Sequence, residues 1–186
     1  MTRAGAWLAG VLVAAAPLLA NASDWVQVDG SRLAFAGKYQ GEVFTGMFPG
    51  FRTRLHFDPT QPEQARLEVD IPMAGVTTGN PEYDGEMRAA AFFDSAAFPQ
   101  ARFQAIGARP LADGRYAMDG TLRLRGISKP VTLTFEWTGG EQAVLFGRAT
   151  LRRLEFGVGS GPWADTRMIP DEIAVSTRVR LVPAVR

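Results

Sequence analysis

The chain has 186 residues, no cysteine, a single histidine, and 20 Lys and Arg residues against 19 Asp and Glu. The absence of cysteine excludes disulfides, thiolate metal sites and a cysteine nucleophile. A net charge of +1 provides no attraction to nucleic acid or to an anionic membrane surface.

The first 22 residues follow the plan of a secretory signal peptide. Arg3 supplies the positive charge, residues 7–20 are apolar, and Ala20-Asn21-Ala22 has the small side chains of a cleavage site. The alternative, an uncleaved anchor, needs roughly 20 apolar residues, and this run is shorter. We therefore expect cleavage after Ala22 and a single mature domain over residues 23–186.

After the signal peptide, apolar side chains recur at every second position, which is the pattern of a β-strand with one buried face. In residues 65–73, for example, Leu67, Val69 and Ile71 alternate with polar residues. Eight segments show this pattern: 25–39 (interrupted at Asp29-Gly30), 52–57, 65–73, 101–105, 118–124, 131–138, 143–151 and 173–181.

One helix is predicted between the third and fourth strands, over residues 81–91. Asn80 can cap it, Pro81 suits the first helical position, and Glu82 is favourable near the N-terminal dipole. Three phenylalanines follow, at Phe92, Phe93 and Phe98. We expect them to pack this segment across one mouth of the sheet structure.

The predicted fold class is all-β. Eight short antiparallel strands can close into a barrel, which removes the exposed edges of an open sheet. A sandwich of two sheets is the alternative that the same pattern allows.

Catalytic signatures are scarce. His56, the only histidine, lies on the polar face of its strand, where we expect it to be solvated. The segment 157–161 matches neither the nucleophile-elbow nor the dinucleotide-binding pattern in register, and is interpreted as a loop. Glu82, Asp84 and Glu86 are spaced as a solvated helix face. We therefore expect no metal site and no enzymatic activity by a common mechanism, although an isomerase or cyclase acting on a bound lipid stays open.

The inward face is apolar along every predicted strand, so the interior is either a packed core or a ligand cavity. Small inward residues favour a cavity because they leave room: Ala65, Ala101, Ala105, Gly120, Ala143, Gly147 and Ala149. The predicted cavity-lining residues are Leu55, Phe57, Leu67, Val69, Ile71, Phe103, Ala105, Met118, Leu122, Leu133, Phe135, Leu145, Val175 and Val179. Arg88, Arg125 and Lys129 are candidates for contacting a ligand head group at the rim, with plain solvated charges as the alternative.

Several motifs together resemble the YceI-like family, in the same order and spacing over nearly the whole mature chain. They are Phe57-Asp58-Pro59, residues 76–80, Met87-Arg88, Phe92-Phe93-Asp94, Phe98-Pro99 with Arg102-Phe103, and residues 120–133. The resemblance implies an eight-stranded, lipocalin-like antiparallel barrel with a helix by one opening. It also implies a periplasmic protein that binds a polyisoprenoid in an elongated apolar cavity.

The expected function is therefore a periplasmic binding or carrier protein for an isoprenoid, either an isoprenoid quinone or a polyprenyl phosphate. No covalent cofactor is expected. The alternative is an interaction module for a membrane cytochrome b561-type redox partner, which would use a rim patch around Phe156 and Trp163. A homodimer is compatible with either function.

Overall fold

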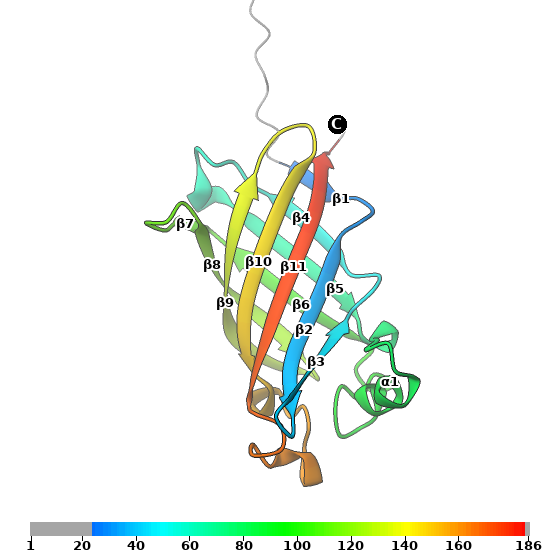
Figure 1. The fold of residues 1–186 in the computed structure, drawn as a ribbon. Helices are drawn as coiled ribbons and strands as arrows, with labels where there is room; N and C mark the ends of the chain where they lie inside the picture. Colours follow the sequence, from blue (N-terminus) through cyan, green and yellow to red (C-terminus); the bar gives the residue numbers. More distant parts are fainter. Residues whose placement is uncertain (1–23, 185–186) are drawn as a thin grey trace, which may run out of the picture.

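A computed structural model describes residues 24–184, so the predicted signal peptide and its cleavage site lie outside the described residues. Nearly all regular structure in the described part is β (Figure 1). The strands are β1 Asp24–Gln27, β2 Arg32–Tyr39, β3 Glu42–Met47, β4 Arg52–His56, β5 Arg66–Pro72, β6 Gln100–Ile106, β7 Arg109–Pro110, β8 Tyr116–Leu124, β9 Ile127–Thr138, β10 Ala143–Arg152 and β11 Glu172–Pro183. Among these residues, no helix is both long and apolar enough to cross a membrane.

Eight antiparallel strands close the barrel, in the order β1, β4, β5, β6, β8, β9, β10 and β11. The ring closes because β1 pairs on both sides: Trp25 lies opposite Leu55 of β4 and opposite Pro183 of β11. The predicted barrel is thus confirmed, and the sandwich alternative is wrong.

The first predicted strand is divided where the sequence indicated. Both β1 and β2 pair with β11, and Gly30, with φ +84°, lies in the turn between them. Beyond that turn, β2 also pairs with β3, a strand that the sequence pattern did not predict. Gln40 and Gly41 form the connecting turn with φ values of 51° and 88°, the left-handed conformations of a tight hairpin. The apolar alternation is weak in β3 because its buried position is Gly46, over which the Phe35 ring packs.

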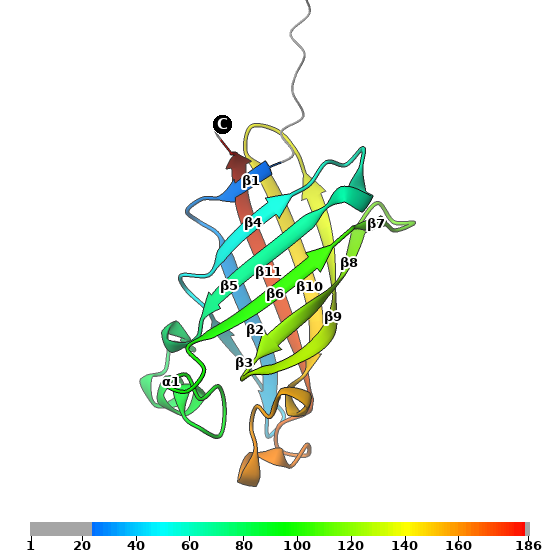
Figure 2. The same cartoon turned by 180° about the vertical axis from the view of Figure 1, so that it is seen from behind.

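The helix α1 covers Pro81–Arg88, so it ends three residues before the predicted boundary. The Asn80 side chain accepts a hydrogen bond from the Glu82 amide at 2.9 Å, as expected for an N-cap. After the helix the chain turns sharply, and Asp94 has a left-handed φ of 47°. This turn is fixed by the Phe93 amide, which bonds to the Met87 carbonyl. Both views place α1 beside one end of the barrel (Figures 1 and 2).

The tightest part of the core lies at the opposite end, where an aromatic cluster fills the barrel. The Phe57 ring packs edge-on against Tyr116, Phe135 and Trp137, with centroids 5.0, 5.4 and 5.1 Å away. Trp25 packs against Trp137 at 5.1 Å and donates its indole N–H to the Phe57 carbonyl. These side chains close that end of the barrel.

Candidate functional site

The inward face divides into a packed half and an open half. Five of the predicted lining residues belong to the packed half, where they are buried and do not line the cavity: Leu55, Phe57, Ala105, Met118 and Phe135. In the other half, inward residues such as Val69, Leu133 and Val175 are only partly buried, although they face the interior. Inward side chains keep accessible surface only where the interior is hollow, so the half nearer α1 holds a cavity.

The cavity has a volume of about 170 Å³. This is more than ten times the ~10–15 Å³ that one water needs on the same measure. Nine predicted residues line it: Leu67, Val69, Ile71, Phe103, Leu122, Leu133, Leu145, Val175 and Val179. That they bind a ligand stays a prediction.

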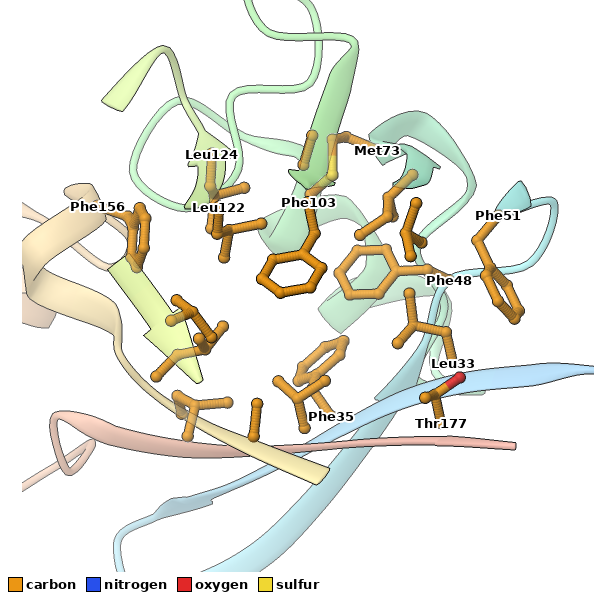
Figure 3. A pocket seen from close by; sticks show the side chains of 18 of the residues that line it. Leu33, Phe35, Phe48, Phe51, Met73, Phe103, Leu122, Leu124, Phe156 and Thr177 are labelled. Atoms are coloured by element: carbon orange, nitrogen blue, oxygen red, sulfur yellow. The ribbon is translucent and has the colours of Figure 1, made fainter. Parts of the chain in front are cut away.

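Part of the wall comes from β2, β3 and the connecting segments, and its residues were not among those predicted to line the cavity. These residues include Leu33, Phe35, Phe44, Phe48, Phe51, Met73, Met87, Phe93, Phe156 and Ile169. Figure 3 shows Phe35, Phe48 and Phe103 converging inside the cavity, and the first two rings lie 5.2 Å apart. Leu33 and Phe35 follow the strand period of residues 25–39. The loop residues follow no strand period, so for them the density of phenylalanine over 44–51 and 92–98 was the available signal.

The small inward residues have two different roles. Ala101, Gly147 and Ala149 line the cavity. Gly120 does not create space, because the Phe103 ring covers it and a Cβ there would lie 2.5 Å from that ring. Ala65, Ala105 and Ala143 are buried outside the cavity wall.

Two segments cover the end of the barrel next to the cavity: residues 77–98, which include α1, and residues 153–171. Ala91 joins them, since its carbonyl accepts hydrogen bonds from the Gly159 and Ser160 amides at 2.8 and 3.0 Å. Aromatic packing reinforces this contact, with the Phe92 and Trp163 rings 5.5 Å apart. The two segments therefore form one cap over this end of the barrel. The cap consists of residues 77–98 and 153–171.

Comparison with known proteins places this geometry in a family. A model of the YceI-like domain matches residues 25–181, almost the whole described structure. The chain belongs to the YceI-like family.

Similar chains occur in pseudomonads. A UPF0312 protein of Pseudomonas putida is 30% identical over 138 residues, covering 70% of this chain and 71% of its own. A second one, from Pseudomonas fluorescens, is 33% identical over 126 residues and covers 61% of this chain and 63% of its own.

Solved structures share the barrel. BcnA of Burkholderia cenocepacia is 25% identical, with a TM-score of 0.80 over 83% of this chain and 98% of its own. The Campylobacter jejuni YCEI protein is 23% identical, with a TM-score of 0.69 over 75% and 85%. A polyisoprenoid binding domain from Saccharophagus degradans is 14% identical, with a TM-score of 0.67 over 87% and 99%. The lipocalin-like barrel of the YceI-like family is thus confirmed for this chain.

Within this YceI-like barrel, two of the three predicted head-group residues stabilise the cap. Arg125 donates from Nη1 to the carbonyls of Ala90, at 2.8 Å, and Phe92. Arg88 is exposed, and its guanidinium lies 3.5 Å from the Val76 carbonyl. Lys129 is half-buried, two residues before Val131, which lines the cavity. None of the three lines the cavity itself.

Asp84, one of the three acids predicted to form a solvated helix face, holds the chain before the helix through hydrogen bonds. Asp84 accepts hydrogen bonds from the Thr78 amide at 2.5 Å and from the Thr77 and Thr78 hydroxyls at 2.9 and 2.7 Å. These bonds, the Thr78 amide first, lower the pKa of the Asp84 carboxyl below its ordinary value. Asp84 thereby fixes the start of the cap.

Arg153 organises the second half of the cap, a role that was not predicted from the sequence. Its side chain is 4% exposed and contributes to the cavity lining. Its donors bond to five backbone carbonyls at 2.6–3.1 Å: Val158, Gly159, Trp163, Ile169 and Pro170. Burial lowers the pKa of the Arg153 guanidinium, with Asp171 acting in the opposite direction. A signal was present, since Arg153 continues the inward alternation of Ala149 and Leu151.

Phe156 and Trp163 do not form the exposed rim patch that the sequence suggested. Phe156 is 2% exposed and faces the cavity, so it is not available to a partner. Trp163 is half-buried between Tyr39 and Phe92. A cytochrome b561-type partner stays a prediction.

Polar chemistry in the cavity wall is sparse. Among its described residues, only Thr53, Arg153 and Thr177 carry polar side-chain atoms. His56 lies outside the wall, with Nδ1 2.7 Å from Asp24 Oδ1. Within residues 24–184, no cluster of His, Asp and Glu suits a metal ion. The wall is therefore suited to an apolar ligand.

A second hollow, on the outer surface, has the opposite character. Four arginines line it: Arg32, Arg115, Arg148 and Arg178. The Arg178 guanidinium lies over the half-exposed Phe146 ring, 5.4 Å from its centroid. This basic surface does not suit an apolar chain, which leaves the interior cavity as the candidate ligand site.

Proposed function

We propose that this protein is an exported carrier that holds an elongated isoprenoid inside the barrel. The observation that carries the proposal is a hollow, apolar half-barrel closed at one end by packed aromatic rings. Burial of apolar surface is the dominant favourable term for such a ligand. The Saccharophagus degradans neighbour, described as a polyisoprenoid binding domain, supports the same ligand class.

The cavity is long enough for a chain molecule. Leu145 and Leu151 both line it, six residues apart on β10. At ~3.3 Å per residue they lie ~20 Å apart along the strand. An isoprenoid quinone or a polyprenyl phosphate would place its chain along this wall. The predicted signal peptide would direct the protein to the periplasm.

Binding to isoprenoid alcohols of increasing length tests this proposal. Each buried carbon contributes ~0.8 kcal/mol, or about fourfold in affinity. Calorimetric titration of delipidated protein with geraniol, farnesol and geranylgeraniol should give stepwise tighter binding until the cavity is full. Equal affinities for all three would contradict burial of the chain.

A matched pair of variants locates the binding site. Ala149 faces the cavity, while the next residue of β10, Thr150, is exposed. Ala149→Trp should fill the cavity and abolish farnesol binding, and Thr150→Trp should leave it unchanged. Loss of binding in both variants, or in neither, would place the ligand elsewhere.

A further inference from the structure

The arginine-lined hollow on the outer surface is not explained by the storage of an apolar ligand. Its residues come from the neighbouring strands β9, β10, β11 and β2, together with Arg115 just before β8 (Figure 1). We propose that this hollow is a docking site for an acidic segment of a partner protein. The hollow lies on the outer side of the barrel wall, so the inference does not depend on which ligand the interior holds.

The strand register gathers three of the arginines into one patch. Arg178 of β11 lies opposite Arg32 of β2 on one side and opposite Phe146 of β10 on the other. Arg148 is the next outward residue along β10. Neighbouring strands lie ~4.8 Å apart, and outward side chains repeat every ~7 Å along a strand, so the Cα atoms of the three arginines fall within about 12 Å of one another.

These three arginines have no carboxylate partner in the described part of the chain. No ion pair among residues 24–184 involves Arg32, Arg148 or Arg178. Arg32 and Arg178 also lie directly opposite each other, and like charges in that position repel. A carboxylate bound between them would replace this repulsion with attraction.

The other wall of the barrel pairs its arginines within the chain. There, Arg54 of β4 and Arg102 of β6 each bond to a carboxylate of β5, at 2.7 and 2.6 Å. In the hollow, the cross-strand neighbours of Arg148 are Thr134 and Ser176, which carry no charge. The carboxylates that would pair with the arginines of the hollow must therefore come from another molecule.

The hollow also contains an exposed aromatic ring. Phe146 is 43% exposed, and the Arg178 guanidinium lies over it, 5.4 Å from the ring centroid. Arginine and aromatic side chains are enriched at the centre of protein–protein interfaces. A guanidinium can also bind a carboxylate through two parallel hydrogen bonds. An acidic segment with an apolar side chain between its carboxylates would match both features.

A protein segment fits this hollow better than an anionic membrane does. A membrane surface is nearly flat on this scale, so it would contact the rim of the hollow and leave the floor unfilled. Glu136, which lies opposite Phe146, also lines the hollow. A membrane presents negative groups over the whole contact, whereas a protein segment can place a neutral residue beside Glu136.

A short acidic peptide tests the docking site. The probe is Glu-Glu-Phe-Glu-Glu with blocked ends and a fluorescent label, and its binding to the wild-type protein is measured by anisotropy at low ionic strength. Arg178→Gln should weaken binding about tenfold, because a charge-assisted contact is lost. The control Arg123→Gln removes the same charge from an exposed position of β8 outside the hollow. It should leave binding within about twofold.

A second peptide, in which alanine replaces the phenylalanine, tests the aromatic contact. Phe146→Ala should weaken binding of the phenylalanine peptide about fivefold. It should leave binding of the alanine peptide within about twofold. Because Phe146 and Arg178 are exposed, thermal unfolding of both variants should match the wild type.

The contrary results are distinct. Absence of peptide binding to the wild type would overturn the docking site, and so would equal losses in Arg178→Gln and Arg123→Gln. Vesicles that contain phosphatidylglycerol are the competing probe. If Arg178→Gln releases the protein from these vesicles but leaves peptide binding unchanged, the hollow binds a membrane and the proposed protein partner is wrong.

Discussion

Replacing Arg153 by methionine should destabilise the cap severely. In the native protein, the donors of this buried guanidinium all bond to carbonyls of residues 158–170, so one side chain fixes the path of the loop. Methionine keeps an unbranched apolar stem and removes every one of these bonds.

The magnitude follows from the carbonyls that lose their partner. The bonds to Val158, Gly159 and Ile169 are buried, and each unsatisfied carbonyl costs ~1–3 kcal/mol. The carbonyls of Trp163 and Pro170 are less buried and can bond to water instead. Burial of the cation, which already lowers the pKa of Arg153, is relieved in the variant and offsets part of the loss. We expect a net destabilisation of about 3–5 kcal/mol.

Urea unfolding followed by tryptophan fluorescence measures this loss, and hydrogen exchange of residues 153–171 localises it. Arg153→Lys should lie between the wild type and Arg153→Met, because an ammonium group has three donors for five carbonyls. Arg152→Met is the matched control: Arg152 is exposed and pairs with Asp171 at 3.0 Å, so the cost should stay below about 1 kcal/mol. If Arg153→Met costs no more than this control, the role assigned to Arg153 is wrong.

Three further predictions concern the packed end and the cap. Ala105→Trp should overpack the closed end and lower the stability measured by thermal unfolding by about 1–3 kcal/mol. The folded variant should still bind farnesol. An unchanged melting temperature would show that this end is not packed. Phe57→Ala should cost about 3–5 kcal/mol in urea unfolding, because the Phe57 ring is fully buried among aromatic rings; a loss below about 1 kcal/mol would contradict that packing. The Asp84 carboxyl has a lowered pKa in the folded protein, so its contribution to stability is present above the ordinary value of 3.8 and is lost as the pH falls through the lowered folded value. In an NMR titration the Thr78 amide proton should therefore shift with a midpoint below 3.8, and Asp84→Asn should abolish the shift; a midpoint at or above 3.8 would contradict the hydrogen-bond network.

The closed ring of strands could be predicted because its signal is local. In β5, Leu67 and Val69 alternate with Glu68 and Asp70, and burial of one face is sufficient to define a strand and its orientation. The hairpin strand β3 lacked this signal, since its buried residue is a glycine covered by Phe35. Glycine has no side chain, so it adds nothing to an alternation of apolar residues.

The division of the interior into packed and open halves could not be predicted from the strand pattern. Leu55 and Val69 occupy equivalent inward positions, yet only Val69 lines the cavity. What separates them is the cluster of Phe57, which follows β4, with Phe135 and Trp137 of β9, a strand distant from it in the sequence. The period-two pattern assigns a side chain to a face but gives no information on which other rings meet it there.

The most direct test of the central claim is mass spectrometry of lipid extracted from the protein purified, without detergent, from its own host. A carrier with a hollow apolar half-barrel should retain an isoprenoid at close to one molecule per chain, and Ala149→Trp should retain none. Wild-type protein that carries no isoprenoid at any stoichiometry would contradict the account.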